Sequence, residues 1–277
     1  MPILHAIVLG IVQGLTEFLP VSSSGHLAVV PWLFGWTELT SDPELNRTFD
    51  VALHVGTFLG AVAYFRTDIA VFAAAGWRSL RRRAVDGPDE RLAWLLLLSS
   101  VPAAVVGVLL DSTVEQYLGA EWLIGVMLVV FGLVLGWSDR LPGGKGEEHF
   151  GVRQALLMGA AQACALQPGV SRSGATISMG RKLGFTRDAA ARLSFLMALP
   201  LIGGVGVYKG LQVLAGDGIP AGFGPAFLWG MVASAVTGFA AVWGLLRFVR
   251  TRSFRPFVFY RVVVGLAVVG VAVSSLR

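Results

Sequence analysis

A short phrase, Val-Ser-x-Ser-Gly, occurs twice in this chain, each time inside a long apolar stretch. The copies occupy residues 21–25 and 170–174, and each is preceded at the same spacing by a Gln (Gln13, Gln162). Polar breaks at membrane depth are tolerated only where they are buried in protein or line a wet cavity. Broken segments at matching places in two halves point to a binding site in membrane folds built from repeats. The duplication therefore predicts two related halves that face each other across one site.

The composition predicts an all-α polytopic membrane protein. Of its 277 residues 55% are hydrophobic and only 14% are charged, with a mean hydropathy of +0.71. Soluble domains usually carry about 25% charged residues. A spanning helix needs roughly 20 apolar residues, and six candidates have nearly that length or more: 50–65 (beginning nearer 48 if longer), 92–110, 122–137, 189–214, 223–246 and 257–275.

Residues 3–36 and 152–184 are apolar but do not form clean spans. Pro20 and the serine run interrupt the first, and Pro168-Gly169 and the second serine run interrupt the other. Each is predicted to form two short helices that enter and leave the membrane on one side, a re-entrant hairpin. We expect one integral membrane domain over residues 1–277, with repeat halves of roughly 1–137 and 150–277.

The basic residues are distributed as a topology signal. Most Lys and Arg lie in segments 66–91, 138–153, 181–188 and 247–256, whereas the alternate segments 37–48, 111–121 and 215–222 are mainly acidic. Cytoplasmic loops carry the excess of Lys and Arg. This assignment places the two broken pairs on opposite membrane faces, so the repeat is predicted to be inverted. The net charge of +5 is thus accounted for by topology, and we expect no nucleic-acid partner.

The second copy has the chemistry of a phosphate cradle. Pro168-Gly169 ends one helix, and Ser171 or Ser173 can cap the next, whose free N–H groups favour anions. The hydroxyls of Ser171, Ser173 and Thr176 add donors, and Arg172 adds a planar fork that suits phosphate. The alternative is a capped helix start whose Arg172 reaches for a lipid headgroup.

The first copy combines a metal-ligand pair with a proton-transfer group. Gln13 and Glu17 share one helix face and together offer oxygen ligands for Mg²⁺. Ser22, Ser23 and Ser24 start the next helix, and His26 can give or take a proton. The alternatives are a structural ion pair between Glu17 and an Arg, and a core role for His26.

Other polar residues are weaker candidates. Asp50 could line the cavity or cap a helix, and we expect Lys209 and Arg261 to snorkel or to form ion pairs. His54 shows no partner pattern.

At these motifs the chain resembles a known family, the bacterial undecaprenyl-diphosphate phosphatases, or bacitracin-resistance proteins. The resemblance rests on residues 13–26 and 168–176, and residues 254–257 with Tyr260-Arg261 and the overall length extend it over the whole chain. It implies an enzyme of the bacterial inner membrane. The charge distribution, with the first broken pair taken to open outside, places the expected site on the outer side. The enzyme would hydrolyse undecaprenyl diphosphate to undecaprenyl phosphate and phosphate, recycling the lipid carrier for peptidoglycan synthesis and conferring bacitracin resistance.

The resemblance also assigns residue roles, and it implies membrane lipids and a second copy of the chain as partners. It carries over Glu17, Ser23, His26, Ser171, Arg172, Ser173 and Thr176 as functional positions, and the helix-start chemistry adds Ser22 and Ser24. The expected catalytic residues are Glu17, Ser23, His26 and Arg172, and the expected substrate-binding residues are Ser22, Ser24, Ser171, Ser173 and Thr176. Glu17 and Gln13 would hold Mg²⁺ or Ca²⁺; the family allows Glu or Gln at position 13. The nucleophile is either Ser23 or a water.

A secondary transporter of an anionic substrate, or a flippase for the lipid phosphate, is the main alternative. Inverted repeats with broken helices are typical of transporters. The acid and the histidine beside an arginine–hydroxyl cradle favour bond cleavage instead.

Overall fold

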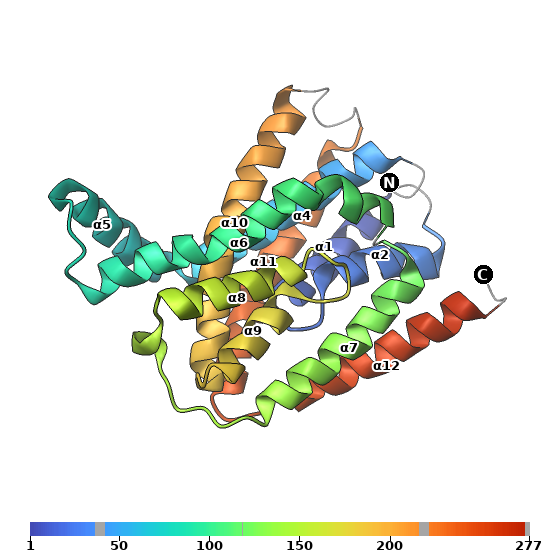
Figure 1. The fold of residues 1–277 in the computed structure, drawn as a ribbon. Coiled ribbons are helices and arrows are strands. Elements are labelled where there is room, and N and C mark those ends of the chain that lie inside the picture. Colours follow the sequence, from blue (N-terminus) through green and yellow to red (C-terminus); the bar gives the residue numbers. More distant parts are fainter. Residues whose placement is uncertain (37–41, 118, 216–221, 275–277) are drawn as a thin grey trace.

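The computed structural model describes residues 1–36, 42–117, 119–215 and 222–274, which form a bundle of helices (Figure 1). The helices in chain order are α1 (Ile3–Phe18), α2 (Ser23–Phe34), α4 (Pro43–Tyr64), α5 (Arg66–Arg82), α6 (Pro88–Tyr117), α7 (Glu121–Asp139), the 3-10 turn η1 (Glu147–His149), α8 (Val152–Cys164), α9 (Arg172–Lys182), α10 (Arg187–Ala215), α11 (Gly224–Val249) and α12 (Arg255–Val273). The described residues contain no strand beyond one isolated bridge between Lys145 and Phe185. The predicted all-α class is confirmed.

Five helices of the described chain are long and apolar enough to cross a membrane: α6, α7, α10, α11 and α12. A sixth span of that kind exists if α4 and α5 are counted together, although they are bent by 84° at Phe65. The six predicted spans therefore correspond to these five helices and α4. Large apolar side chains such as Val108 and Phe259 stay exposed on the spans, as lipid-facing residues do.

Two local predictions are wrong. Helix α4 begins at Pro43 and not near residue 48, because the Asp42 side chain accepts hydrogen bonds from Glu44 N and Leu45 N and caps it. The predicted basic loop 66–91 contains a further helix, α5, which packs on α6 and projects from the body (Figure 1). The segment was predicted as a loop because it is rich in arginine. It is an amphipathic helix, and its buried face includes Ala75 and Ser79.

Each broken region forms two short helices, as predicted: α1 with α2, and α8 with α9. The residue that precedes the second helix has the same unusual backbone in both copies. Ser22 has φ 78° and ψ 97°, and Ser171 has φ 72° and ψ 116°. A positive φ is uncommon for residues other than glycine, and such strain concentrates at functional sites. The two phrases thus share a backbone conformation as well as a sequence.

The two broken pairs pack reciprocally against the longer helices. Helix α1 packs on α11, and α8 packs on α6. The glycine that precedes each Gln makes the close approach: a Cβ on Gly10 would lie 2.2 Å from Gly230 O, and one on Gly159 would lie 2.4 Å from Ser99 O. Helices α7 and α12 lie side by side (Figure 1). The broken pair of the first half thus packs on a helix of the second half, and the broken pair of the second half packs on a helix of the first, which fits the predicted repeat.

Candidate active site

The breaks of the two copies meet inside the bundle and bond to each other. Gly169 N donates a hydrogen bond to Ser22 Oγ at 3.1 Å, and Ser173 Oγ donates one to Leu19 O at 3.0 Å. Ser22 and Ser173 are both buried. The first serine of one copy, Ser22, and the second serine of the other, Ser173, therefore join the two halves across one site.

A buried arginine from the last helix holds both breaks in place. The guanidinium of Arg261 donates to the carbonyl oxygens of Pro20 (3.1 Å), Gly169 (2.8 Å) and Val170 (2.9 Å), and also to Leu128 O of α7 (3.1 Å). Its side chain is fully buried. The expectation that Arg261 snorkels or forms an ion pair is wrong, because the irregular backbone of the breaks leaves carbonyl groups that only a buried donor can satisfy.

Glu17 is the centre of the site. Its Oε1 accepts a hydrogen bond from Arg172 Nη2 at 2.6 Å, and its Oε2 accepts one from Ser23 Oγ at 2.5 Å and one from Gln13 Nε2 at 2.9 Å. The bond to Gln13 confirms that the two residues share one face of α1. The side chains of Glu17 and Arg172 are only 6% and 15% exposed, so this is a buried ion pair between the two copies. Glu17 does pair with an arginine, and that arginine is the predicted phosphate ligand.

His54 is a site residue that the sequence reasoning did not identify. Its Nε2 lies 3.7 Å from Glu17 Oε2, and its Nδ1 is 2.8 Å from Asp50 O one turn earlier on α4. The distance of His54 from the two motifs along the sequence does not predict a contact with Glu17, because α4 and Glu17 meet only through tertiary packing. The one available clue was Asp50, four residues earlier, which was a cavity-lining candidate.

His26 faces the last helix instead of Glu17. Its Nδ1 lies 2.7 Å from Ser22 O, and its Nε2 lies 2.7 Å from the hydroxyl of Tyr260, whose ring stacks on the imidazole. His26 is buried, whereas Tyr260 is partly exposed. Tyr260 was noted only in the family resemblance and had no assigned role. The structure makes it the partner of the predicted proton-transfer group.

The remaining predicted hydroxyls lie around the two helix starts. Ser171 caps α9 as predicted, because its Oγ accepts a bond from Gly174 N at 3.1 Å, and it lies 3.2 Å from Ser173 Oγ. Thr176 donates to Arg172 O at 2.8 Å and lies 2.6 Å from Ser194 Oγ. Ser24 is exposed, with its Oγ 3.4 Å from Ser22 Oγ.

The donor set suits a hard cation in part. No group of three or more His, Cys, Asp or Glu residues in the described parts of the chain is arranged to hold a metal ion. Gln13 Oε1 is nevertheless buried without a hydrogen-bond partner, on the amide whose Nε2 donates to Glu17. Mg²⁺ commonly takes one or two carboxylates and completes its shell with water and substrate phosphates. An amide oxygen and a carboxylate fit that pattern.

Comparison with known proteins places this chain among proteins of one family. Residues 6–267 match the family model described as bacitracin resistance protein BacA. A curated relative from Pelobacter propionicus named undecaprenyl-diphosphatase is 48% identical over 100% of this chain and 99% of its own length. Proteins of the same name from Geobacter sulfurreducens (47% identical, 97% of each chain) and Pelotomaculum thermopropionicum (44% identical, 99% of this chain and 98% of the relative) are similar over nearly their whole lengths. The chain belongs to the bacitracin resistance protein BacA family.

Proposed function

We propose that this chain is a membrane phosphatase that hydrolyses undecaprenyl diphosphate to undecaprenyl phosphate and inorganic phosphate. The reaction recycles the lipid carrier for cell-wall synthesis and confers resistance to bacitracin. The observation that carries the proposal is the contact of Arg172, Glu17 and Ser23, a phosphate ligand, an acid and a hydroxyl, between the two breaks. The full-length similarity to proteins named undecaprenyl-diphosphatase supports the same substrate.

The diphosphate binds at the start of α9. Arg172 offers a bidentate fork, and the N-terminal N–H groups of the helix favour an anion. The ion pair with Glu17 keeps the fork in place before substrate arrives, so binding exchanges a carboxylate for a phosphate on Arg172. Fixed donors of this kind stabilise the charge that develops on the transferred phosphoryl group.

Ser23 is the proposed nucleophile and Glu17 its general base. A hydroxyl donating to a carboxylate at 2.5 Å is the arrangement expected of an activated nucleophile. Ser23 Oγ forms a bond to the terminal phosphorus, its proton goes to Glu17, and the bond from that phosphorus to the bridging oxygen breaks. Undecaprenyl phosphate leaves, and water then cleaves the phosphoserine to release inorganic phosphate and restore Ser23.

His26 and Tyr260 form a second proton-transfer pair at the edge of the site. His26 Nε2 and the Tyr260 hydroxyl are 2.7 Å apart, and the Tyr260 side chain is partly exposed. We assign to this pair the delivery of a proton to the departing phosphate.

Glu17 and Gln13 Oε1 are the groups that would hold Mg²⁺ or Ca²⁺. A bound divalent cation supplies positive charge that offsets the charge of the phosphate oxygens. The unpartnered amide oxygen of Gln13 supports this assignment.

We further propose the cytoplasmic (inner) membrane of a bacterium as the location, with the site open to the outer side. The distribution of basic segments supports the sides assigned to the loops. The opening to the outer side is proposed with the first broken pair taken to open there. A homodimer is proposed from the family resemblance alone. The pairing of Ser23 with Glu17 favours phosphatase chemistry over the transporter or flippase alternative, because passage of a lipid phosphate needs no activated hydroxyl.

Phosphate release from undecaprenyl diphosphate by purified variants tests the proposal. Arg172→Ala, Glu17→Ala and Ser23→Ala should each lower turnover by roughly 10²-fold or more, the cost of removing one transition-state donor. Arg78→Ala, at an exposed position on α5, is the control and should leave turnover unchanged. Near wild-type turnover in Arg172→Ala and Glu17→Ala would overturn the site. Translocation of lipid by reconstituted vesicles without any phosphate release would overturn the enzymatic function.

A further inference from the structure

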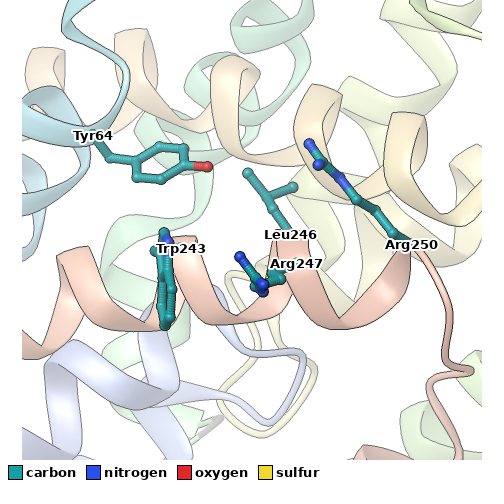
Figure 2. Close-up of a pocket in the computed structure, with 5 residues that line it drawn as sticks. All are labelled: Tyr64, Trp243, Leu246, Arg247 and Arg250. Carbon is teal, nitrogen blue, oxygen red and sulfur yellow. The ribbon is translucent and has the colours of Figure 1, made fainter.

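A small pocket lies between α11 and the end of α4, lined by residues outside the candidate active site. It is lined by Tyr64, Trp243, Leu246, Arg247 and Arg250, and none of these residues belongs to the site around Glu17 (Figure 2). Its volume is about 90 Å³. A cavity needs only roughly 10–15 Å³ to admit one water molecule, so this one has room for a small polar group.

The pocket is lined by donors of hydrogen bonds and carries positive charge. Arg247 and Arg250 bring two guanidinium groups, and Tyr64 and Trp243 bring a hydroxyl and an indole N–H; Figure 2 shows Tyr64 reaching across toward the side chains of α11. No carboxylate lines it. Arg250 is 3.4 Å from the partly exposed Asp188, and within the described chain no acid pairs with Arg247, which lies 6.0 Å over the Trp243 ring. This set of groups suits a phosphate.

An exposed apolar strip leads away from the pocket along α11. Phe239, Val236 and Val232 are 40%, 64% and 39% exposed, and their spacing of three and four residues places them on one face of the helix. Phe239 contacts Tyr64 edge to face, with ring centroids 5.7 Å apart, so the strip begins at the pocket wall. Because α11 is one of the candidate membrane spans, this strip faces lipid chains.

The charge pattern also places the pocket at a membrane surface that attracts anions. It lies in the last two turns of α11, where the basic segment 247–256 begins, a segment assigned by its charge to the cytoplasmic side. Tyrosine and tryptophan are enriched at the headgroup level of membrane proteins. Basic pockets between spanning helices on the cytoplasmic side bind anionic lipid headgroups.

We propose that this pocket binds the phosphate headgroup of an anionic membrane lipid, whose chains lie along the exposed strip of α11. The two arginines contact the phosphate, and the aromatic side chains fix the depth of the headgroup. The site is distinct from the catalytic site and does not depend on the proposed hydrolysis.

Lipid retention by the purified full-length protein tests the proposal. Native mass spectrometry would compare binding of phosphatidylglycerol and phosphatidylcholine by wild type, by Arg247→Gln/Arg250→Gln and by the control Arg252→Gln/Arg255→Gln, which removes two exposed arginines nearby. The pocket variant should bind phosphatidylglycerol roughly tenfold or more weakly, since each arginine near the surface contributes about 1 kcal/mol. The control should bind it like wild type. Equal losses in both double variants, or none in either, would overturn the proposal.

Two further arms identify the source of the phosphate. Inorganic phosphate alone should bind far more weakly than phosphatidylglycerol, and Phe239→Ser should weaken phosphatidylglycerol binding without removing a charge. If inorganic phosphate bound as tightly as the lipid, and Phe239→Ser had no effect, the pocket would be a free-phosphate site and the lipid assignment would be wrong. Phosphate release from undecaprenyl diphosphate, measured on the same variants, reports separately on the catalytic site.

Discussion

The buried pair of Glu17 and Arg172 predicts a large energetic coupling between the two copies of the motif. The atoms are 2.6 Å apart, and the side chains are 6% and 15% exposed. Removing one partner of such a pair leaves an uncompensated charge in the interior, whereas removing both does not. The coupling is therefore measured with a double-mutant cycle made of wild type, Glu17→Gln, Arg172→Met and the double variant.

The expected magnitude follows from what each substitution leaves behind. Glu17→Gln keeps a side chain of the same shape beside Ser23 and Gln13, but it leaves the buried guanidinium of Arg172 without a counter-charge. This should lower the free energy of unfolding by about 3–5 kcal/mol. Arg172→Met should cost somewhat less, since Ser23 and Gln13 still donate to the carboxylate. The double variant contains no unpaired charge, so we expect a coupling free energy of about 2–3 kcal/mol between the two positions.

Equilibrium unfolding in mixed micelles, followed by circular dichroism, measures all four proteins. The pair of Arg250 and Asp188 is a suitable control, because its atoms are 3.4 Å apart and its side chains are 69% and 41% exposed. Coupling there should stay below about 1 kcal/mol. Strictly additive losses for Glu17→Gln and Arg172→Met, or a double variant less stable than both singles, would refute the buried pair.

Three further predictions follow from the same structure. Arg261→Lys keeps the charge but loses the planar guanidinium that donates to four carbonyl groups at 2.8–3.1 Å. The free energy of unfolding should fall by about 3 kcal/mol, and phosphate release should be lost. Arg255→Lys, at an exposed position, is the control and should change neither. Gly14→Ala would place a Cβ 1.9 Å from Thr237 Oγ1 and should cost about 1–3 kcal/mol in a thermal melt, whereas Gly244→Ala, with nothing within 4 Å, should be tolerated. Removing divalent cations with a chelator should suppress phosphate release, and added Mg²⁺ or Ca²⁺ should restore it; activity that survives exhaustive chelation would argue against a metal at Glu17 and Gln13.

Much of the candidate site could be predicted because its parts are local in sequence. Gln13 and Glu17 lie one helical turn apart, and Ser171 lies three residues before the N–H that it caps. Such relations follow from helix geometry and need no tertiary information. The helix α5 was missed for a local reason as well, since a run of arginines disguised its amphipathic face.

His54, Tyr260 and Arg261 belong to the part of the site that no spacing predicts. They lie on α4 and α12, and they reach Glu17, His26 and the two breaks across 37, 234 and more than 90 positions of chain. A lone histidine or arginine in an apolar helix gives no sign of its partner, so Arg261 was expected to pair with an acid or with lipid. Only the packed helices show that it satisfies backbone carbonyls.

The sequence by itself determined the membrane class, the two broken helix pairs and the identity of the polar residues that they bring. Hydropathy, charge distribution and helix-start chemistry are properties of short segments, and they act before the chain is packed. The tertiary structure alone decided which of those residues meet. It set Arg172 of one copy against Glu17 of the other and turned His26 toward Tyr260, because the free energy of a buried charge or donor depends on partners from distant parts of the chain. The repeat of Val-Ser-x-Ser-Gly is visible in the letters, but the contact between its two copies exists only in the fold.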